Sequence, residues 1–174
     1  LLGLTAEEGE PCIARMVCGG GTGCKDKEDY HGVGDCRAAV LVQGGPKACD
    51  YACVGLGSCV EACPFEAIVM GADGLPKVIE ERCTACGACE RICPRGVIQV
   101  MPKKHVVWVK CQSHDKGAVV NKICQTGCIA CRKCEKECPF DAIHVINNLA
   151  VIDYEKCKLC GKCAKVCPKN TIID

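Results

Sequence analysis

Residues 83–94 read CTACGACERICP, and this stretch decides the fold of the chain. Its cysteines stand at 83, 86, 89 and 93, separated by two, two and three residues, and proline follows the last. In runs with this spacing the first three thiolates hold one iron-sulfur cubane, and the fourth reaches the cubane of a partner run. The stretch therefore predicts bound clusters and a second run packed against it.

Three more runs end in Cys-Pro, and two of them have the full spacing. Since paired runs exchange their fourth thiolates, the four runs predict four clusters. The complete ligand sets are Cys83, Cys86, Cys89 with Cys63; Cys128, Cys131, Cys134 with Cys167; and Cys157, Cys160, Cys163 with Cys138. The remaining set has only Cys53, Cys59 and Cys93, because Leu56 stands where its second cysteine belongs. Either another cysteine completes a [4Fe-4S] cluster there, with Cys49 the first candidate, or the site holds a [3Fe-4S] cluster.

Seven of the 22 cysteines lie outside the runs: Cys12, Cys18, Cys24, Cys36, Cys49, Cys111 and Cys124. They suffice for a fifth [4Fe-4S] cluster, for which the candidate set is Cys18, Cys24 and Cys36 with Cys49 or Cys12. Free, buried or disulfide-bonded thiols are the alternative, because no standard spacing supports this site. For Cys111 and Cys124, a structural role and ligation both stay open.

Other uses of so many cysteines fit less well. A disulfide framework needs an oxidising compartment, and no secretory signal is visible. Structural zinc sites use two separated ligand pairs rather than runs of four that close on proline. Residues 18–24, CGGGTGC, lack the Lys-Ser/Thr of a phosphate-binding loop, so no bound nucleotide is expected. Their glycines instead let backbone N–H groups approach cluster sulfurs.

The chain contains an internal duplication. Cys36, Cys49, Cys53, Cys59 and Cys63 recur 75 positions later as Cys111, Cys124, Cys128, Cys134 and Cys138. Between the runs of each copy, apolar segments at 67–70 and 77–80, and at 142–146 and 150–153, flank short Asp-Gly or Asn-Asn turns and predict hairpins. The predicted fold class is α+β: tandem bacterial two-cluster ferredoxin-like modules with short hairpins and helices. We expect a linker and Cys-rich segment at 1–48, modules at 49–102 and 124–174, and a connecting strand or loop at 103–123.

Charge points away from nucleic acid as a partner. Each cubane with four thiolates carries a formal charge of about −2. Four clusters therefore change the formal net charge from +1 to about −7. An acidic protein is not expected to bind a polyanion.

Several motifs resemble the RnfB subunit of the ion-translocating ferredoxin:NAD oxidoreductase (Rnf) complex, over about residues 30–174. They are the Cys-Pro runs, GDCRAA at 34–39, GPKAC at 45–49, GLGSC at 55–59 and HDKG at 114–117. The Leu56 position without cysteine is also part of that family's pattern.

The resemblance implies an electron-transfer subunit at the cytoplasmic face of the membrane. It would accept electrons from reduced ferredoxin and pass them through [4Fe-4S] clusters to other subunits of a membrane oxidoreductase that ends at NAD. No motif for flavin, NAD or a general base is present, so no catalytic bond chemistry is expected from this chain. The alternatives are a free soluble polyferredoxin and the relay domain of a larger enzyme such as a hydrogenase or reductase. We expect residues 1–11 to be a linker or the remainder of a longer chain, and the host to be anaerobic.

The clusters are expected to hold the fold together. Aromatic residues make up only 3% of the chain, so the side chains of an ordinary core are scarce. Because thiolates must converge from an extended chain, cluster assembly and folding are coupled. After anaerobic chelation and oxidation of the clusters, circular dichroism is expected to show loss of most secondary structure. A cooperative thermal transition that survives complete iron removal would contradict this prediction.

Overall fold

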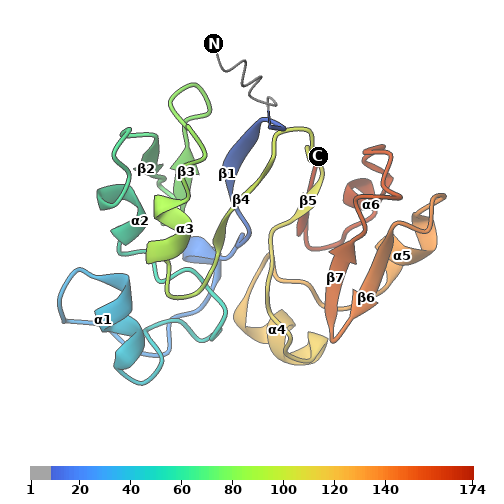
Figure 1. Cartoon of the computed structure of the whole chain (residues 1–174). Coiled ribbons are helices and arrows are strands. Elements are labelled where there is room, and N and C mark those ends of the chain that lie inside the picture. The colour runs from blue at the N-terminus through green and yellow to red at the C-terminus, as the bar shows by residue number, and fades with distance from the viewer. Residues whose placement is uncertain (1–8) are drawn as a thin grey trace, which may run out of the picture.

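The computed structural model describes residues 9–174. It has two halves that lie side by side, which we name the first module, residues 9–102, and the second module, residues 103–174 (Figure 1). The expected N-terminal linker falls mainly on residues 1–8, which lie outside the described residues. The predicted α+β fold of short hairpins and helices is confirmed.

The first module combines two pairs of antiparallel strands with three short helices. β2 (Ile68–Met70) pairs with β3 (Pro76–Val78) as the predicted hairpin. β1 (Cys12–Met16) pairs with β4 (Ile98–Pro102). The helices are α1 (Cys36–Leu41), α2 (Ser58–Glu61) and α3 (Ala88–Ile92), and a 3-10 turn, η1, spans Gly21–Gly23. Since β1 supplies half of a strand pair, part of the segment expected to stand apart belongs to this module's fold.

The second module repeats this plan. β6 (Ile143–Ile146) and β7 (Leu149–Ile152) form its hairpin, in which Asn147 and Asn148 both have positive φ, as a type I′ turn requires. β5 (Trp108–Val109) pairs with β8 (Ile172–Ile173). The helices are α4 (Gly117–Ile123), α5 (Lys133–Glu137) and α6 (Lys162–Lys165). The segment 103–123, expected as a connecting strand or loop, thus contains both β5 and α4.

Each cysteine run ends in one short helix, and the backbone turns sharply before that helix begins. The N-cap residues Gly57, Gly87, Arg132 and Gly161 are all left-handed, with φ between 57° and 81°. Two positions earlier, Gly55, Ala85, Ala130 and Leu159 are left-handed as well. This alternation bends successive N–H groups inward, a backbone shape that forms concave binding sites for anions and iron-sulfur clusters.

Direct contacts join the two modules near β1 and β5. The indole Nε1–H of Trp108 donates to the carbonyl of Met16 at 3.1 Å. The guanidinium of Arg15 lies 4.5 Å from the centre of the Trp108 ring. The single tryptophan of the chain thereby fastens β5 to β1.

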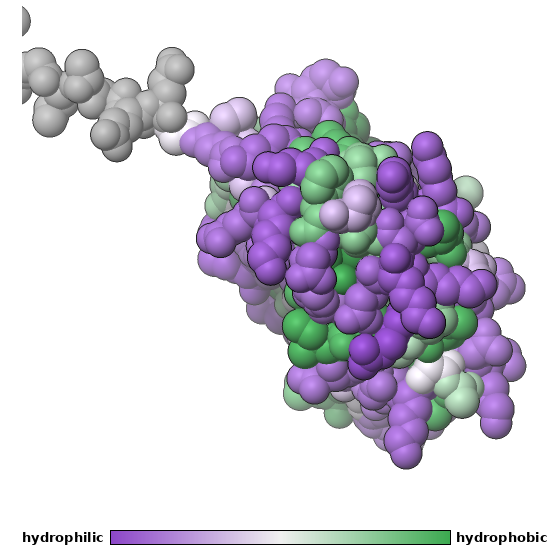
Figure 2. Space-filling model, turned by 90° about the vertical axis from the view of Figure 1, so that its right-hand side faces the viewer, coloured by the Kyte–Doolittle hydropathy of each residue, from purple (hydrophilic) through white to green (hydrophobic). Residues whose placement is uncertain are grey.

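The view of Figure 2 shows a largely hydrophilic face with hydrophobic residues in separate patches. Among the described residues, no helix has both the length and the apolar character needed to cross a membrane.

Candidate functional site

Five cavities of similar size are lined by cysteines. Including their open mouths, their volumes lie between about 300 and 390 Å³. Four of them are lined by four cysteines each, and the fifth by five. Within residues 9–174, no three His, Cys, Asp or Glu side chains converge closely enough to hold a single metal ion. The thiols therefore surround open cavities and do not meet at the position of a single ion.

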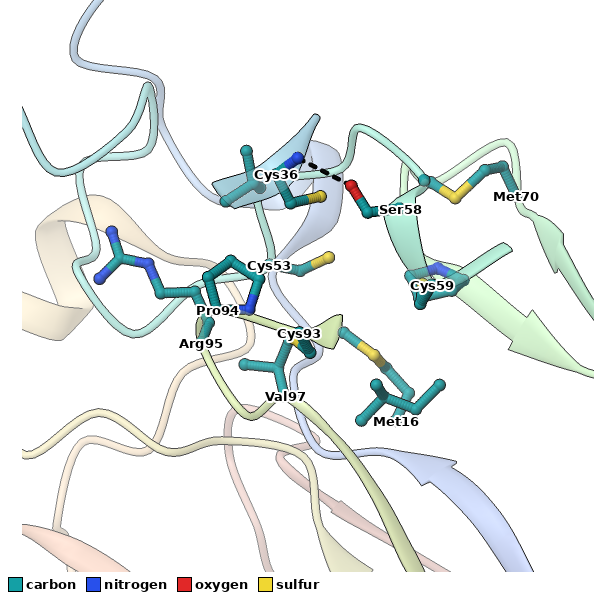
Figure 3. Close-up of a pocket in the computed structure, with 14 residues that line it drawn as sticks. Met16, Cys36, Cys53, Ser58, Cys59, Met70, Cys93, Pro94, Arg95 and Val97 are labelled. Carbon is teal, nitrogen blue, oxygen red and sulfur yellow. Dashed lines mark hydrogen bonds between the residues drawn. The ribbon is translucent and has the colours of Figure 1, made fainter. Parts of the chain in front are cut away.

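The first cavity is lined by Cys36, Cys53, Cys59 and Cys93 (Figure 3). The thiols of Cys36 and Cys53 point into the space between α1 and the first run, residues 53–63, and apolar Met16 and Val97 lie below it. Cys36 therefore lies beside the three thiols whose set lacked a fourth member. The sequence interpretation named Cys49 for this place, but Cys49 lines the fifth cavity.

Local hydrogen bonds explain the position of Cys36. The Asp35 carboxylate caps α1 by accepting from the backbone N–H groups of Arg37 and Ala38 at 2.8 and 2.9 Å. These bonds, chiefly that from Ala38, lower the pKa of Asp35. The backbone N–H of Cys36 donates to the hydroxyl of buried Ser58 at 2.8 Å. Because Ser58 begins α2, this bond holds the start of α1 against the first run.

Three cavities bring together the cysteines that the run spacing had grouped. The second cavity is lined by Cys63, Cys83, Cys86 and Cys89; the third by Cys128, Cys131, Cys134 and Cys167; and the fourth by Cys138, Cys157, Cys160 and Cys163. In each cavity three thiols come from one run and the fourth from its partner. Such all-thiol sets suit cubane clusters, which are bound by four cysteine thiolates.

Backbone N–H groups point at several of these sulfurs. The sulfurs of Cys63, Cys138 and Cys167 each accept from the N–H four residues later, at 3.3 Å in all three cases. Hydrogen bonds of this kind favour the thiolate and tune the reduction potential of a bound cluster.

The backbone of the run at the first cavity follows the same path as that of a complete run, although its second cysteine is replaced by Leu56. Gly55 and Gly57 flank Leu56 with φ of 84° and 81°. These two positions correspond to Ala85 and Gly87 in the complete run, whose φ values are 56° and 74°. The left-handed turns of a cluster-binding run are therefore retained, and the residues present fit a four-thiol site with Cys36 as the fourth member.

The fifth cavity is lined by Cys18, Cys24, Cys49, Cys111 and Cys124. This grouping departs from the expected set, since Cys36 lies at the first cavity. Cys12 lines none of the five cavities, and its thiol donates to the carbonyl of Glu10 at 3.3 Å. Cys111 and Cys124, whose roles the sequence left open, both face the fifth cavity. No sequence spacing groups these two cysteines with the other three, because the two sets come from different modules. Only the folded structure brings all five together.

Burial shapes the titration of the thiols. It raises the pKa of Cys53 to about 12 and those of Cys59, Cys89 and Cys111 to about 11. A shared hydrogen bond with Cys24 instead lowers the pKa of Cys124 to about 5 and raises that of Cys24. Since metal ligation requires thiolates, cluster binding must release protons from the buried thiols.

Two family models match the chain. A 4Fe-4S dicluster domain matches residues 52–98, and a 4Fe-4S binding domain matches residues 125–144 and 150–173. The matches cover the Cys-Pro runs of both modules. The predicted [4Fe-4S] cofactor type is therefore confirmed.

Three curated relatives are similar over most of the chain, and each is a subunit of an ion-translocating oxidoreductase complex. The relative from the proton-translocating ferredoxin:NAD(+) oxidoreductase complex of Clostridium ljungdahlii is 51% identical over 158 residues, 90% of this chain and 56% of the relative. The relative from the Na(+)-translocating ferredoxin:NAD(+) oxidoreductase complex of Acetobacterium woodii is 44% identical over 161 residues, 91% of this chain and 48% of the relative. The relative from the ion-translocating oxidoreductase complex of Methanosarcina acetivorans is 47% identical over 158 residues, 90% of this chain and 60% of the relative.

The chain thus spans about half the length of the curated relatives it matches. Its similarity to them runs through both modules and includes the segment before the first run. The resemblance drawn from the sequence motifs is confirmed: the chain belongs to the RnfB-type subunits of ion-translocating ferredoxin:NAD oxidoreductases.

Proposed function

We propose that this chain is the electron-relay part of an RnfB-type subunit. It accepts electrons from reduced ferredoxin and carries them through [4Fe-4S] clusters towards a membrane-bound, ion-translocating NAD oxidoreductase. The observation that carries this proposal is the grouping of sixteen cysteines around four cavities, two in each module. The names of the relatives support ferredoxin as donor and other subunits as partners.

The four cavities support four ligand sets. They are Cys36, Cys53, Cys59 and Cys93; Cys63, Cys83, Cys86 and Cys89; Cys128, Cys131, Cys134 and Cys167; and Cys138, Cys157, Cys160 and Cys163. When bound, each cluster supplies a site that takes up and releases one electron. The protein holds the four sulfurs apart, directs N–H groups at them and surrounds them with apolar side chains. Because the N–H donors are fixed by the backbone, they need no reorganisation when an electron arrives.

Exchange of the fourth thiol keeps the two cavities of a module close together. Cys63 follows Cys59 of the first cavity by four residues but lines the second, and Cys93 follows Cys89 of the second but lines the first. Cys138 and Cys167 are exchanged in the same way in the second module. Each run therefore touches two neighbouring sites, which gives electrons a short path between them.

Reduction by ferredoxin tests the proposal directly. When the anaerobically prepared, cluster-loaded chain is mixed with a reduced two-cluster ferredoxin, we expect its visible cluster absorbance to fall and signals of reduced clusters to appear in low-temperature EPR. Chain from which iron has been removed is the control and should show neither change. Reduction by dithionite but not by ferredoxin would contradict ferredoxin as the donor.

Assembly with membrane partners is a separate expectation. Affinity purification of the full-length protein from its host, after mild detergent extraction, is expected to recover the membrane-bound subunits of the oxidoreductase with it. A full-length protein that is found only as a soluble monomer would instead support a free polyferredoxin.

A substitution at Cys36 tests the first ligand set. In Cys36→Ala only three thiols remain at the first cavity, so we expect a [3Fe-4S] EPR signal of about one spin per chain in the oxidised protein, absent from the unsubstituted chain. Cys12→Ala is the matched control, because Cys12 lines none of the five cavities, and it should leave the spectrum unchanged. If the spectrum and iron content of Cys36→Ala are unchanged, a residue other than Cys36 is the fourth ligand.

A further inference from the structure

The fifth cavity lies between the two modules. Its cysteines come from both, with Cys18, Cys24 and Cys49 in the first module and Cys111 and Cys124 in the second. Its volume of about 320 Å³ falls within the range of the other four cavities. Three of its thiols are buried and two are half-buried, so they line an interior site rather than a surface.

Cys18 and Cys111 occupy equivalent places in the two modules. Each follows the end of a strand by two residues, after β1 and β5. The residue before each cysteine donates its backbone N–H to the residue that precedes the partner strand, Val17 to Val97 at 2.8 Å and Lys110 to Thr171 at 2.7 Å.

The hydrogen bonds at the two sulfurs match as well. The sulfur of Cys18 accepts from the N–H of Gly20, and that of Cys111 from the N–H of Ser113, both two residues later and both at 3.4 Å. The structural equivalence thus pairs Cys111 with Cys18. The 75-residue sequence repeat had paired it with Cys36, which lies at a different kind of position in the first cavity.

Cys49 and Cys124 form the second equivalent pair. Each stands four residues before the first cysteine of a run, Cys53 or Cys128. Together the two pairs give four thiols, two from each module, around one cavity. From this arrangement we propose that Cys18, Cys49, Cys111 and Cys124 hold a fifth [4Fe-4S] cluster that connects the modules.

Glycine keeps the space among these thiols open. A Cβ at Gly20 would lie 3.6 Å from the sulfur of Cys18 and 3.7 Å from that of Cys124, and only 3.0 Å from the Cβ of Cys24. Any larger side chain there would extend among the sulfurs. The glycine-rich segment thus serves this cavity, and its Gly20 N–H contacts a ligand sulfur.

Cys24 is the one thiol of this cavity without a counterpart, since Gly117 stands at the corresponding distance after Cys111. Its backbone forms an isolated antiparallel bridge with Cys124, and its thiol donates to the carbonyl of Lys25 at 3.8 Å. We assign Cys24 as a positioning residue, because its buried side chain lines the cavity beside Cys124 without belonging to either equivalent pair.

Backbone pairing around the cavity holds the two modules in register. Gly19 donates to the carbonyl of Lys110 at 2.9 Å, Lys25 to that of Ile123 at 2.8 Å, and Gln125 to that of Gly23 at 3.0 Å. Thiols from separate modules can share a cluster only if such contacts fix their relative position.

The fifth cavity adjoins one site in each module. On the first-module side, Ala52 lines it while the next residue, Cys53, lines the first cavity. On the second-module side, the sulfur of Cys111 accepts from the N–H of Cys128, which lines the third cavity, at 3.4 Å. An electron leaving a cluster in one module would reduce the fifth cluster and then pass to the other module, with no bond formed or broken and no proton transferred.

This relay role rests on the proposed function, whereas the site itself rests on the geometry of the cavity. Anaerobic iron and acid-labile sulfide analysis of the cluster-loaded chain tests the site. We expect about 20 irons per chain, and about 16 in the double variant Cys49→Ala/Cys111→Ala, which removes one ligand from each module. Cys12→Ala is the control and should keep about 20 irons.

Two measurements keep the test decisive. Circular dichroism and EPR of the double variant are expected to show an intact fold and the four other clusters. If the double variant does not fold, the count in the unsubstituted chain still decides, since about 16 irons there would overturn the fifth site. If ferredoxin reduces a chain that holds only about 16 irons, the fifth site is refuted and the proposed function stands. If the chain holds about 20 irons but ferredoxin does not reduce it, the fifth site stands and the proposed function is refuted.

Within the fifth site, Cys24→Ala separates positioning from ligation. We expect it to retain about 20 irons with an altered EPR line shape or a shifted potential for one cluster, because a buried thiol that lines the cavity beside the ligand sulfurs is lost. Loss of iron in Cys24→Ala, together with full iron in Cys124→Ala, would assign Cys24 as the ligand instead.

Discussion

The rest of the structure depends on the exchange of one cysteine between neighbouring runs. Cys63 and Cys93 each belong to one run but line the cavity of the other run of the first module. For this reason α2 and α3 must lie side by side. The strand pairs then form around this centre, with Ile68 and Ile98 buried against the cysteines. A chain with so few aromatic residues gains its interior in this way, from sulfur-lined sites rather than from a large apolar core.

The segment before the first run is an integral part of the fold. It supplies β1, which completes the strand pair with β4, and α1, which brings Cys36 to the first cavity. It also supplies residues 18–25, which contact the second module through backbone hydrogen bonds. The same fifty residues therefore complete one module and join it to the other.

The sequence by itself determined which cysteines of the runs gather together, because two-residue and three-residue spacings act locally. Left-handed residues between consecutive cysteines wind each run around one space, and the helix that follows directs the fourth thiol outward to its partner. For the same reason the hairpins at 68–78 and 143–152 were predictable from their flanking apolar residues and turns.

Only the tertiary structure decided where the other seven cysteines lie. Cys49 is nearer to the first run in sequence than Cys36, yet the Asp35 cap and the bond from the Cys36 N–H to Ser58 bring Cys36 to the first cavity. The equivalence of Cys18 with Cys111 is likewise invisible in the spacing, since loops of different length follow β1 and β5. These positions depend on contacts between segments far apart in the chain, and sequence separation carries no information about such distances.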